Sequence, residues 1–479
     1  MADHGVFVSQ QATSVSTPVL ADSGIPFAIG TAPVQSAAAP GKAGIPVLCT
    51  SWDEAVEQLG YSDDWETYSL CEVMYSHFKL FASQPLILYN LLEPDEMDEE
   101  VAAQDYPVDD HQVALPLEAI ASSIVVQVPG EEPESPTTLV EGTDYAVRYN
   151  SDDNACIVEL LGDSTSYEAE TLNIAYSKVD GSGIEAADVA MAVDAVDLCM
   201  TELGVIPDLL IAPGWSGDTE VAAVMAAKAP KINGLFEGKT LIDIDSNTNR
   251  RYTEAVAVKT RNNFVDKAEV VCWPCVKLGE RMYHLSTQFS GLMAEVDTGN
   301  SGIPYESPSN KNLQMDSLCL EDGTEVNLTW EQANILNSNG ICTALNFMSS
   351  GWVAWGNYTA CYPSNTDVKD YFIPVSRMFA WVGNTVIRTT WSKLDKPMIP
   401  RLADNIQNTF NIWLNGLTGS QYILGGRIEF LEEENPATDL MAGIMRFHIY
   451  ITPPSPAQEI DFILEYDVDY LSSLFQQAA

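Results

Sequence analysis

Residues 208–229 read DLLIAPGWSGDTEVAAVMAAKA, a short apolar run followed by a longer alanine-rich segment. The run at 208–212 has the length and composition of a buried strand, and residues 219–229 have the apolar content of a helix that packs on it. Proline and glycine between the two segments predict a turn. Because a strand followed directly by a helix is the repeating unit of a helix-covered parallel sheet, this stretch predicts an α/β fold.

The same alternation continues on both sides of this stretch. We expect further strands at 25–29, 85–91, 241–244 and 268–272, and further helices at 64–81, 186–203 and 286–297. This succession predicts a mostly parallel sheet with helices on both faces. We assign this α/β core to residues 25–109 and 184–327.

A different pattern interrupts the core between residues 110 and 183. Strand-like segments occur at 124–128, 145–149, 155–161 and 171–179, separated by clusters of turn-forming residues. We therefore predict an inserted all-β domain at 110–183. The acidic stretch at 93–110 in front of it has the composition of a solvated linker.

Residues 328–456 mix helices and strands in a third pattern. The expected elements are helices at 329–337, 375–391 and 402–417 and strands at 341–348, 352–360, 422–431 and 444–452. We interpret this region as a C-terminal α+β subdomain. Residues 1–24 and 457–479 are expected to be extended terminal arms.

The composition excludes several classes of function. The chain has 479 residues, and 46% of them are hydrophobic, which predicts a folded protein. Its formal net charge of -45 predicts that it repels phosphate backbones and anionic lipid. We therefore expect neither nucleic-acid binding nor membrane insertion. The nine scattered cysteines and the lack of a signal-peptide pattern predict a protein that is made and kept in a reducing cytosol.

The turn Gly214-Trp215-Ser216-Gly217-Asp218 lies where a hydrolase would place its nucleophile elbow. Asp218 replaces the last glycine of that motif, and Glu220 adds a second carboxylate at the helix start. Two negative charges there would oppose a developing oxyanion. We predict that Ser216 is a turn residue, with a hydrolase nucleophile as the alternative.

Two further motifs are incomplete. Cys272 and Cys275 form a CxxC pair, but extended chain follows it, whereas a redox pair needs its first thiol at a helix N-terminus. Residues 243–254 have the ligand spacing of a calcium loop, but Thr248 occupies the position that requires glycine. We therefore predict no catalytic residue, no cofactor and no metal site.

Residues 459–470 read EIDFILEYDVDY and alternate apolar with acidic side chains. Ile460, Phe462 and Leu464 fall on one face of the strand that this period of two predicts. The preceding segment TPPSPA, at 452–457, has the composition of a stiff, extended spacer. The strand can fold back onto its own sheet or pair with another molecule.

Several short motifs occur in a fixed order along the chain: CWP at 272–274, GIPYESPSNK at 302–311, LNSNGI at 336–341, VAWG at 353–356, and the PP and EIDF segments at 453–462. In this order they resemble the motifs of contractile tail sheath proteins of phages and related particles. The amino-terminal segment Gly5-Val6-Phe7-Val8 is similar as well. Two positions depart from the family pattern, Cys275 after the proline turn and Asn357 after the Trp-Gly strand.

The resemblance implies a structural subunit that polymerises as stacked hexameric rings around an inner tail tube. It also implies contraction that drives the tube through a target envelope, contacts with baseplate and tail terminator proteins, and a place in a phage tail or tail-like particle assembled in the host cytoplasm. Terminal arms of the family add strands to neighbouring subunits, so the candidate exchange residues are Val6, Phe7, Val8, Ile460, Phe462 and Leu464. The alternatives are a hydrolase using Ser216 and a surface-binding protein acting through the inserted β domain.

Overall fold

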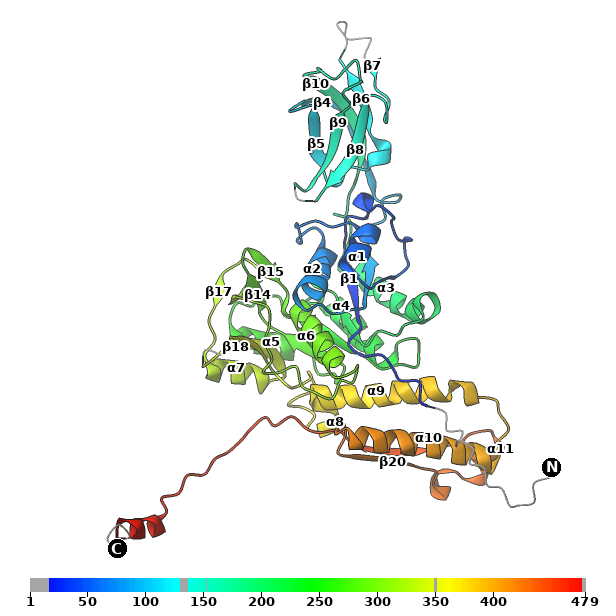
Figure 1. Ribbon diagram of the computed structural model, residues 1–479, viewed down its shortest axis with the longest axis vertical. Helices are drawn as coiled ribbons and strands as arrows, with labels where there is room; N and C mark the ends of the chain where they lie inside the picture. Colours follow the sequence, from blue (N-terminus) through cyan, green and yellow to red (C-terminus); the bar gives the residue numbers. More distant parts are fainter. Residues whose placement is uncertain (1–16, 130–136, 152, 349–350, 476–479) are drawn as a thin grey trace, which may run out of the picture.

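The structure, a computed structural model, describes residues 17–129, 137–151, 153–348 and 351–475. Figure 1 shows three parts along the long axis: a β-sandwich, an α/β body, and a layer built around two long helices. The described chain enters and leaves at the helical layer, at the far end from the β-sandwich.

The body is organised around an eight-stranded sheet. Its strand order is β19-β18-β13-β12-β11-β1-β3-β2. The bounds are β1 Pro26–Gly30, β2 Val47–Cys49, β3 Leu86–Asn90, β11 Leu209–Ile211, β12 Lys239–Asp243, β13 Glu269–Cys272, β18 Ile341–Asn346 and β19 Trp352–Trp355. The six inner strands are parallel, and the two edge strands pair antiparallel with their neighbours.

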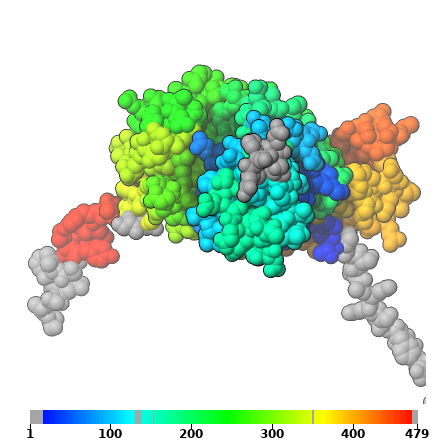
Figure 2. Space-filling model, turned by 90° about the horizontal axis from the view of Figure 1, so that it is seen from above, coloured from blue at the N-terminus to red at the C-terminus, as the bar shows by residue number. Residues whose placement is uncertain are grey.

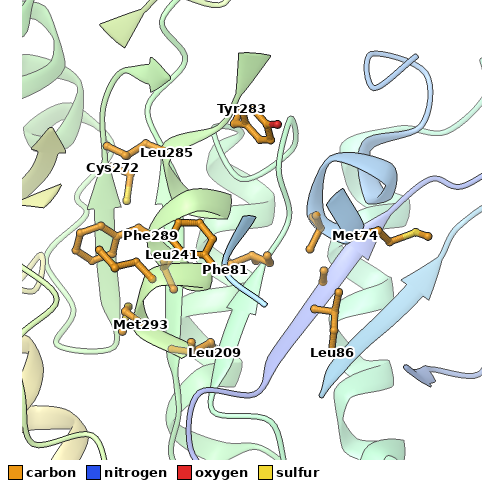
Figure 3. Close-up of a cluster of buried hydrophobic side chains, with 14 of the residues drawn as sticks. Met74, Phe81, Leu86, Leu209, Leu241, Cys272, Tyr283, Leu285, Phe289 and Met293 are labelled. Carbon is orange, nitrogen blue, oxygen red and sulfur yellow. The ribbon is translucent and has the colours of Figure 1, made fainter. Parts of the chain in front are cut away.

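Helices cover both faces of this sheet because its strands are apolar on both sides. Along β1, Ala28 packs in one buried cluster, whereas Phe27 and Ile29 pack in another. The first face is covered by α1 (Trp52–Leu59), α2 (Ser69–Tyr75) and α6 (Leu285–Gly299), and the second by α3 (Ala186–Ala192) and α4 (Thr219–Lys228). Figure 3 shows Phe289 and Met293 of α6 against the sheet residues Leu209 and Leu241.

Shorter elements complete the body. They are α5 (Tyr252–Arg261), α7 (Trp330–Asn337) and a four-stranded antiparallel sheet of β14 (Cys275–Leu278), β15 (Arg281–Tyr283), β16 (Ser317–Cys319) and β17 (Glu325–Val326). Two expected helices differ in detail. The helix expected at 64–81 begins at Ser69 and ends in a π-helical turn, Ser76–Leu80. The helix expected at 186–203 is α-helical only over α3 and continues as 3-10 and π turns.

The inserted β-sandwich consists of two facing sheets, ordered β4-β10-β6-β7 and β5-β9-β8. Its strands are β4 Asp98–Pro107, β5 Gln112–Pro116, β6 Val125–Val128, β7 Thr137–Thr138, β8 Tyr145–Asn150, β9 Ala155–Leu160 and β10 Thr171–Val179. The prediction of a linker at 93–110 is wrong for β4, which pairs with β10 along nearly its whole length. Its acidic side chains lie on an exposed edge strand, where charge opposes pairing with other chains.

The predicted boundary at residue 328 is also wrong. β18 pairs in parallel with β13, with Val271 opposite Ile341, so α7, β18 and β19 belong to the body. The helical layer begins with α8 (Val368–Tyr371) and contains α9 (Ile373–Thr390), α10 (Pro400–Gly419), β20 (Gly425–Glu429), α11 (Ala437–Met441) and β21 (His448–Thr452). Trp381 of α9 and Leu414 of α10 share the buried cluster of this layer.

A buried ionic group joins the helical layer to the body. Arg377 of α9 donates to Asp297 of α6 at 3.1 Å and to Asp208 at 2.7 Å. Burial raises the pKa of the Asp297 carboxyl, whereas the two carboxylates outweigh burial and raise the pKa of Arg377. Because removing one partner would leave an unpaired buried charge, the two parts are held firmly together.

Candidate assembly site

The chain enters the described structure along α9. The Val19 amide donates to Thr389 Oγ1 at 2.9 Å, and the Ala21 amide donates to Thr385 Oγ1 at 3.0 Å. The Trp381 indole N–H donates to the Ala21 carbonyl at 2.9 Å. The N-terminal segment is therefore bound to α9 of the helical layer from Val19 onward. The candidate exchange residues Val6, Phe7 and Val8 lie outside the described residues.

The C-terminal segment leaves the body at the other end of α9 and extends beyond the outline of the molecule (Figures 1 and 2). Residues 453–467 are extended and belong to no strand, and a 3-10 helix, Val468–Phe475, follows. The expected strand at 459–470 is thus absent from the isolated subunit. The interpretation in which it folds back onto its own sheet is wrong.

This C-terminal arm, defined as residues 459–471, carries apolar side chains that are exposed. Ile460 is 68% exposed, Phe462 84% and Leu464 95%. Ile463 and Tyr466 are also largely exposed. A row of exposed apolar side chains of this kind is characteristic of a protein interface, because water exposure of so much apolar surface is unfavourable.

A possible acceptor for such an arm is the sheet of β20 and β21. These two strands pair antiparallel, with Gly425 opposite Thr452 and Ile428 opposite Ile449. Among the described residues no third strand pairs with them. On β20 the outer edge is partly occupied, because Asn411 of α10 accepts from the Ile428 amide at 3.0 Å and donates to its carbonyl at 3.2 Å, so the outer edge of β21 is the one open to a further strand. A two-stranded sheet of this kind gains stability when further strands are added.

A groove of about 1000 Å³ lies where the C-terminal arm leaves the body. Five separate segments of the chain line it: the loop at 302–311, helix α7 with the residue that follows it, residues 355–362, the start of α9, and residues 454–459. The lining includes Tyr305, Asn310, Lys311, Asn337, Ser338, Trp355, Asn357, Tyr358 and Pro454. Residues of the GIPYESPSNK, LNSNGI, VAWG and PP motifs therefore meet at a single place in the fold, whereas the CWP motif at 272–274 is not part of it.

Local geometry explains why these motifs meet. The Asn310 amide donates to the Ala354 carbonyl at 2.7 Å, and the Ala354 amide donates to the Lys311 carbonyl at 2.9 Å, so the 302–311 loop runs beside β19. Gly356 has a φ of 153°, and a side chain there would meet Cys342 Cα at 2.9 Å. Asn357, the departure from the family pattern, accepts a hydrogen bond from Ser307 Oγ.

Ser216 is a turn residue with no access to solvent. Its hydroxyl donates to Asp243 Oδ2 at 3.3 Å and accepts from the Asp243 amide at 3.0 Å, which joins the ends of β11 and β12. Asp218 caps α4 by accepting from the Glu220 amide at 2.8 Å. Ser216 and Asp218 are thus both used in structural hydrogen bonds.

The CxxC pair is structural as well. Cys272 ends β13 and Cys275 begins β14, and both are buried free thiols. Burial raises the pKa of each thiol well above its usual value, so neither is poised as a thiolate. The turn at Gly279 follows with a φ of 61°.

The would-be calcium ligands make internal hydrogen bonds. Asp243 accepts from the Ser286 amide at 2.9 Å, and Asp245 accepts from the Asn247 amide at 2.8 Å. Glu254 accepts from the Arg251 amide at 3.0 Å at the start of α5. In the part of the chain that the structure describes, no group of three or more acidic, histidine or cysteine side chains could hold a metal ion.

Charge is unevenly distributed between the two ends of the molecule. Residues 98–180, which form the β-sandwich, contain 19 acidic residues against two basic ones, Arg148 and Lys178. Residues 368–458, which include the helical layer, contain eight of each. Exposed apolar side chains also occur at the corner between α9 and α10, including Trp391 and Leu394, each 60% exposed. The two ends therefore suit different surroundings.

Sequence reasoning missed the residues that tie these parts together. Arg377 and Tyr358 carry no local motif, and their partners lie far away in the sequence. The cluster Tyr358, Tyr362, Tyr371 and Phe372 was the available signal, since dense aromatic residues often line a recognition surface.

No helix among the described residues is both long and apolar enough to cross a bilayer.

Comparison with known proteins gives the class of this fold. The structure superposes on the helical sheath of the anti-feeding prophage in its contracted state with a TM-score of 0.59, at 15% identity, covering 98% of this chain and 100% of that one. It superposes on the sheath complex of an extracellular contractile injection system, PVC, with a TM-score of 0.58, at 13% identity, covering 98% and 99%. The chain has the fold of a contractile sheath subunit, and the predicted mixed α/β class is confirmed.

Sequence comparison agrees with the fold. The chain is 24% identical to the tail sheath protein of Burkholderia phage BcepMu, over 98% of both proteins. No family model matches the chain. The resemblance to the contractile tail sheath family, first seen in scattered motifs, is thereby confirmed over nearly the whole length.

Proposed function

We propose that this protein is the structural subunit of a contractile tail sheath, in a phage tail or a tail-like particle. Subunits assemble in the host cytoplasm as hexameric rings that stack helically around an inner tail tube, between a baseplate and a terminator. Contraction of the polymer drives the tube through a target envelope. The relatives in the comparison are sheath proteins, and the two solved sheath structures are both in a contracted state, which supports this proposal.

The observation that carries the proposal is the exposed C-terminal arm. Phe462 and Leu464 are almost wholly exposed, and the segment extends away from the body (Figure 1). In a polymer, these side chains would lie on a neighbouring subunit. A contact between two different surfaces of the same chain does not close on a two-fold axis, so repetition produces rings or helices.

The sheet of β20 and β21 is the acceptor in this proposal. Strand addition forms backbone hydrogen bonds with the open edge, while side chains of one face supply apolar contacts. Backbone pairing keeps two subunits connected when their bodies rotate relative to one another. Linked bodies of this kind can move from an extended to a contracted arrangement without dissociating.

Charge orients the subunit in the polymer. The strongly acidic β-sandwich faces outward, where like charge keeps neighbouring particles apart. The helical layer, with balanced charge and exposed Trp391 and Leu394, faces inward to the tube. This orientation also places the C-terminal arm in the inner layer, where neighbours are closest.

No chemical step is part of this function. Ser216 is buried between the amide and the carboxylate of Asp243, and the thiols of Cys272 and Cys275 are buried. These contacts disfavour the hydrolase alternative. The surface-binding alternative through the β-sandwich has no comparable observation in its favour.

Electron microscopy of the purified protein tests the proposal. The full chain is expected to form tubes or stacked rings, whereas a chain that ends at Gln458 is expected to stay as folded, dispersed subunits. Circular dichroism and thermal unfolding of the shortened chain verify that its body is folded. Discrete monomers of the full chain at high concentration would contradict the proposal.

A further inference from the structure

We propose that the aromatic wall of the groove at the root of the C-terminal arm is a proline-recognition surface, and that the chain's own spacer, Pro453 to Gln458, docks along it. The arm therefore pivots at Glu459, on the distal side of the spacer, and the spacer moves with the body. The consequence for assembly rests on the proposed sheath function. The docking itself is a property of the single subunit.

Burial along the spacer shows which side faces the groove. Pro453 is buried, and Pro454 and Pro456 are half-buried, whereas Ser455 and Ala457 are exposed. A free spacer would expose all of these residues alike. The groove lining includes Pro454 and Pro456 together with Pro374, at the start of α9.

A hydrogen bond closes the far end of the spacer. Tyr358 Oη donates to Gln458 Oε1 at 2.8 Å, across 100 positions of sequence. Burial raises the pKa of the Tyr358 phenol above its usual value, so this hydroxyl keeps its proton and remains a donor. Beyond Gln458 the described residues up to Leu471 are exposed.

The wall that carries Tyr358 is aromatic and rigid. Tyr358 stacks on Tyr362 with ring centroids 4.0 Å apart and lies 5.6 Å from Phe372. An antiparallel bridge joins the backbones of Tyr358 and Phe372, and the Thr359 amide donates to the Tyr371 carbonyl at 2.8 Å. The ring positions are therefore fixed before the spacer docks.

This chemistry is that of proline-rich recognition elsewhere. Prolines restrict the chain to an extended conformation, so little entropy is lost on docking, and aromatic grooves with a hydrogen-bonding side chain bind such segments. Here the ligand is covalently attached, which raises its effective concentration at the groove. The spacer is thereby docked without a high intrinsic affinity.

Docking of the spacer limits where the arm can reach. The 12 residues from 459 to 470 span at most about 40 Å when extended, measured from a fixed origin on the body. A spacer free from Thr452 onward would add six residues, or about 20 Å, and spread the arm over many directions. The groove thus directs each arm toward a defined neighbour and lowers the entropic cost of strand addition.

Site-directed spin labelling of the full chain, kept dilute so that it is unassembled, tests the docking. The nine native cysteines are buried, so a nitroxide attaches selectively to an introduced surface cysteine. One label replaces Ser455 in the spacer and another replaces Ile463 in the arm, both exposed positions. We expect the label at 455 to move with the body and the label at 463 to move on the nanosecond time scale of a free chain.

Variants assign the docking to the contacts described. Tyr358→Phe removes only the hydroxyl and should lower the docked-to-free ratio at position 455 about five-fold, as expected for the loss of one neutral hydrogen bond. A double change, Pro454→Gly with Pro456→Gly, should release the label completely. Tyr422→Phe, a half-buried tyrosine outside the groove, is the matched control and should change nothing.

Equal mobility at 455 and 463 in the unchanged chain would overturn the inference, as would a spacer label unaffected by the double proline change. Both readings are made on single subunits. Failure of the chain to form tubes would contradict the sheath function and leave the spin-label result standing. Tubes formed by a chain with a freely mobile spacer would contradict only the docking.

Discussion

Replacing Phe462 and Leu464 of the C-terminal arm with serine should prevent assembly without destabilising the subunit. Both side chains are at least 84% exposed in the subunit, so neither contributes to its folding. Burial of a large apolar side chain is worth about 1.5–3 kcal/mol, so burying both against a neighbour contributes roughly 3–6 kcal/mol per arm. Since 1.4 kcal/mol corresponds to a factor of ten, the double change should raise the critical concentration for assembly about a hundred-fold or more.

The matched control uses the opposite face of the same segment. Asp461→Ser with Glu465→Ser changes two residues at the same depth of the arm but on the side that stays in water. Sedimentation of polymer over a range of concentrations measures both variants, and thermal unfolding checks the subunit. Assembly of the Phe462/Leu464 variant at the normal concentration, or equal loss in the control, would refute the assignment of the apolar face to a neighbour.

Three further predictions concern the body and the inserted domain. Arg377→Met leaves Asp297 buried without its partner and should lower the free energy of unfolding by about 3–5 kcal/mol. Arg388→Met breaks a partly exposed pair with Asp22 and should lower it by less than about 1 kcal/mol. Denaturant unfolding of the two variants measures the difference. Burial alone would lower the pKa of His284, but the carboxylate of Glu72 outweighs burial and raises that pKa to about 9. The pair of His284 and Glu72 therefore stabilises the folded protein fully below pH 6.5 and progressively less as the pH rises to 9. Glu72→Gln should remove that part of the pH dependence, seen as the difference between the two unfolding curves. Replacing exposed acidic residues of the β-sandwich by their amides should leave assembly intact, as electron microscopy would show. Loss of assembly in this variant would instead mean that these acidic residues lie at a subunit interface.

The sequence predicts the elements of the body well where one periodicity dominates. The strand at 208–212 and the helix at 219–229 lie within two residues of β11 and α4. Residues 98–107 carry no alternation because almost all of their side chains are exposed, so β4 is visible only through its pairing with β10. The position of β18 likewise depends on a partner strand about 70 residues away.

The candidate site was only partly predictable, for a related reason. Alternation in residues 459–470 marks an apolar face, and the structure leaves that face uncovered. The composition of the Pro-rich spacer predicts a stiff, extended segment, but composition alone does not indicate which other part of the chain the spacer contacts. Its docking depends on Tyr358, a residue 100 positions away, and on a groove that forms only when five separate segments have folded.

The most direct test of the account is a cryo-electron microscopy map of the assembled polymer. We predict that residues 459–470 lie as an added strand on an open edge of the β20 and β21 sheet of a neighbouring subunit, with Ile460, Phe462 and Leu464 covered. An arm folded onto its own body in the polymer, or subunits joined only through the β-sandwich, would contradict the account.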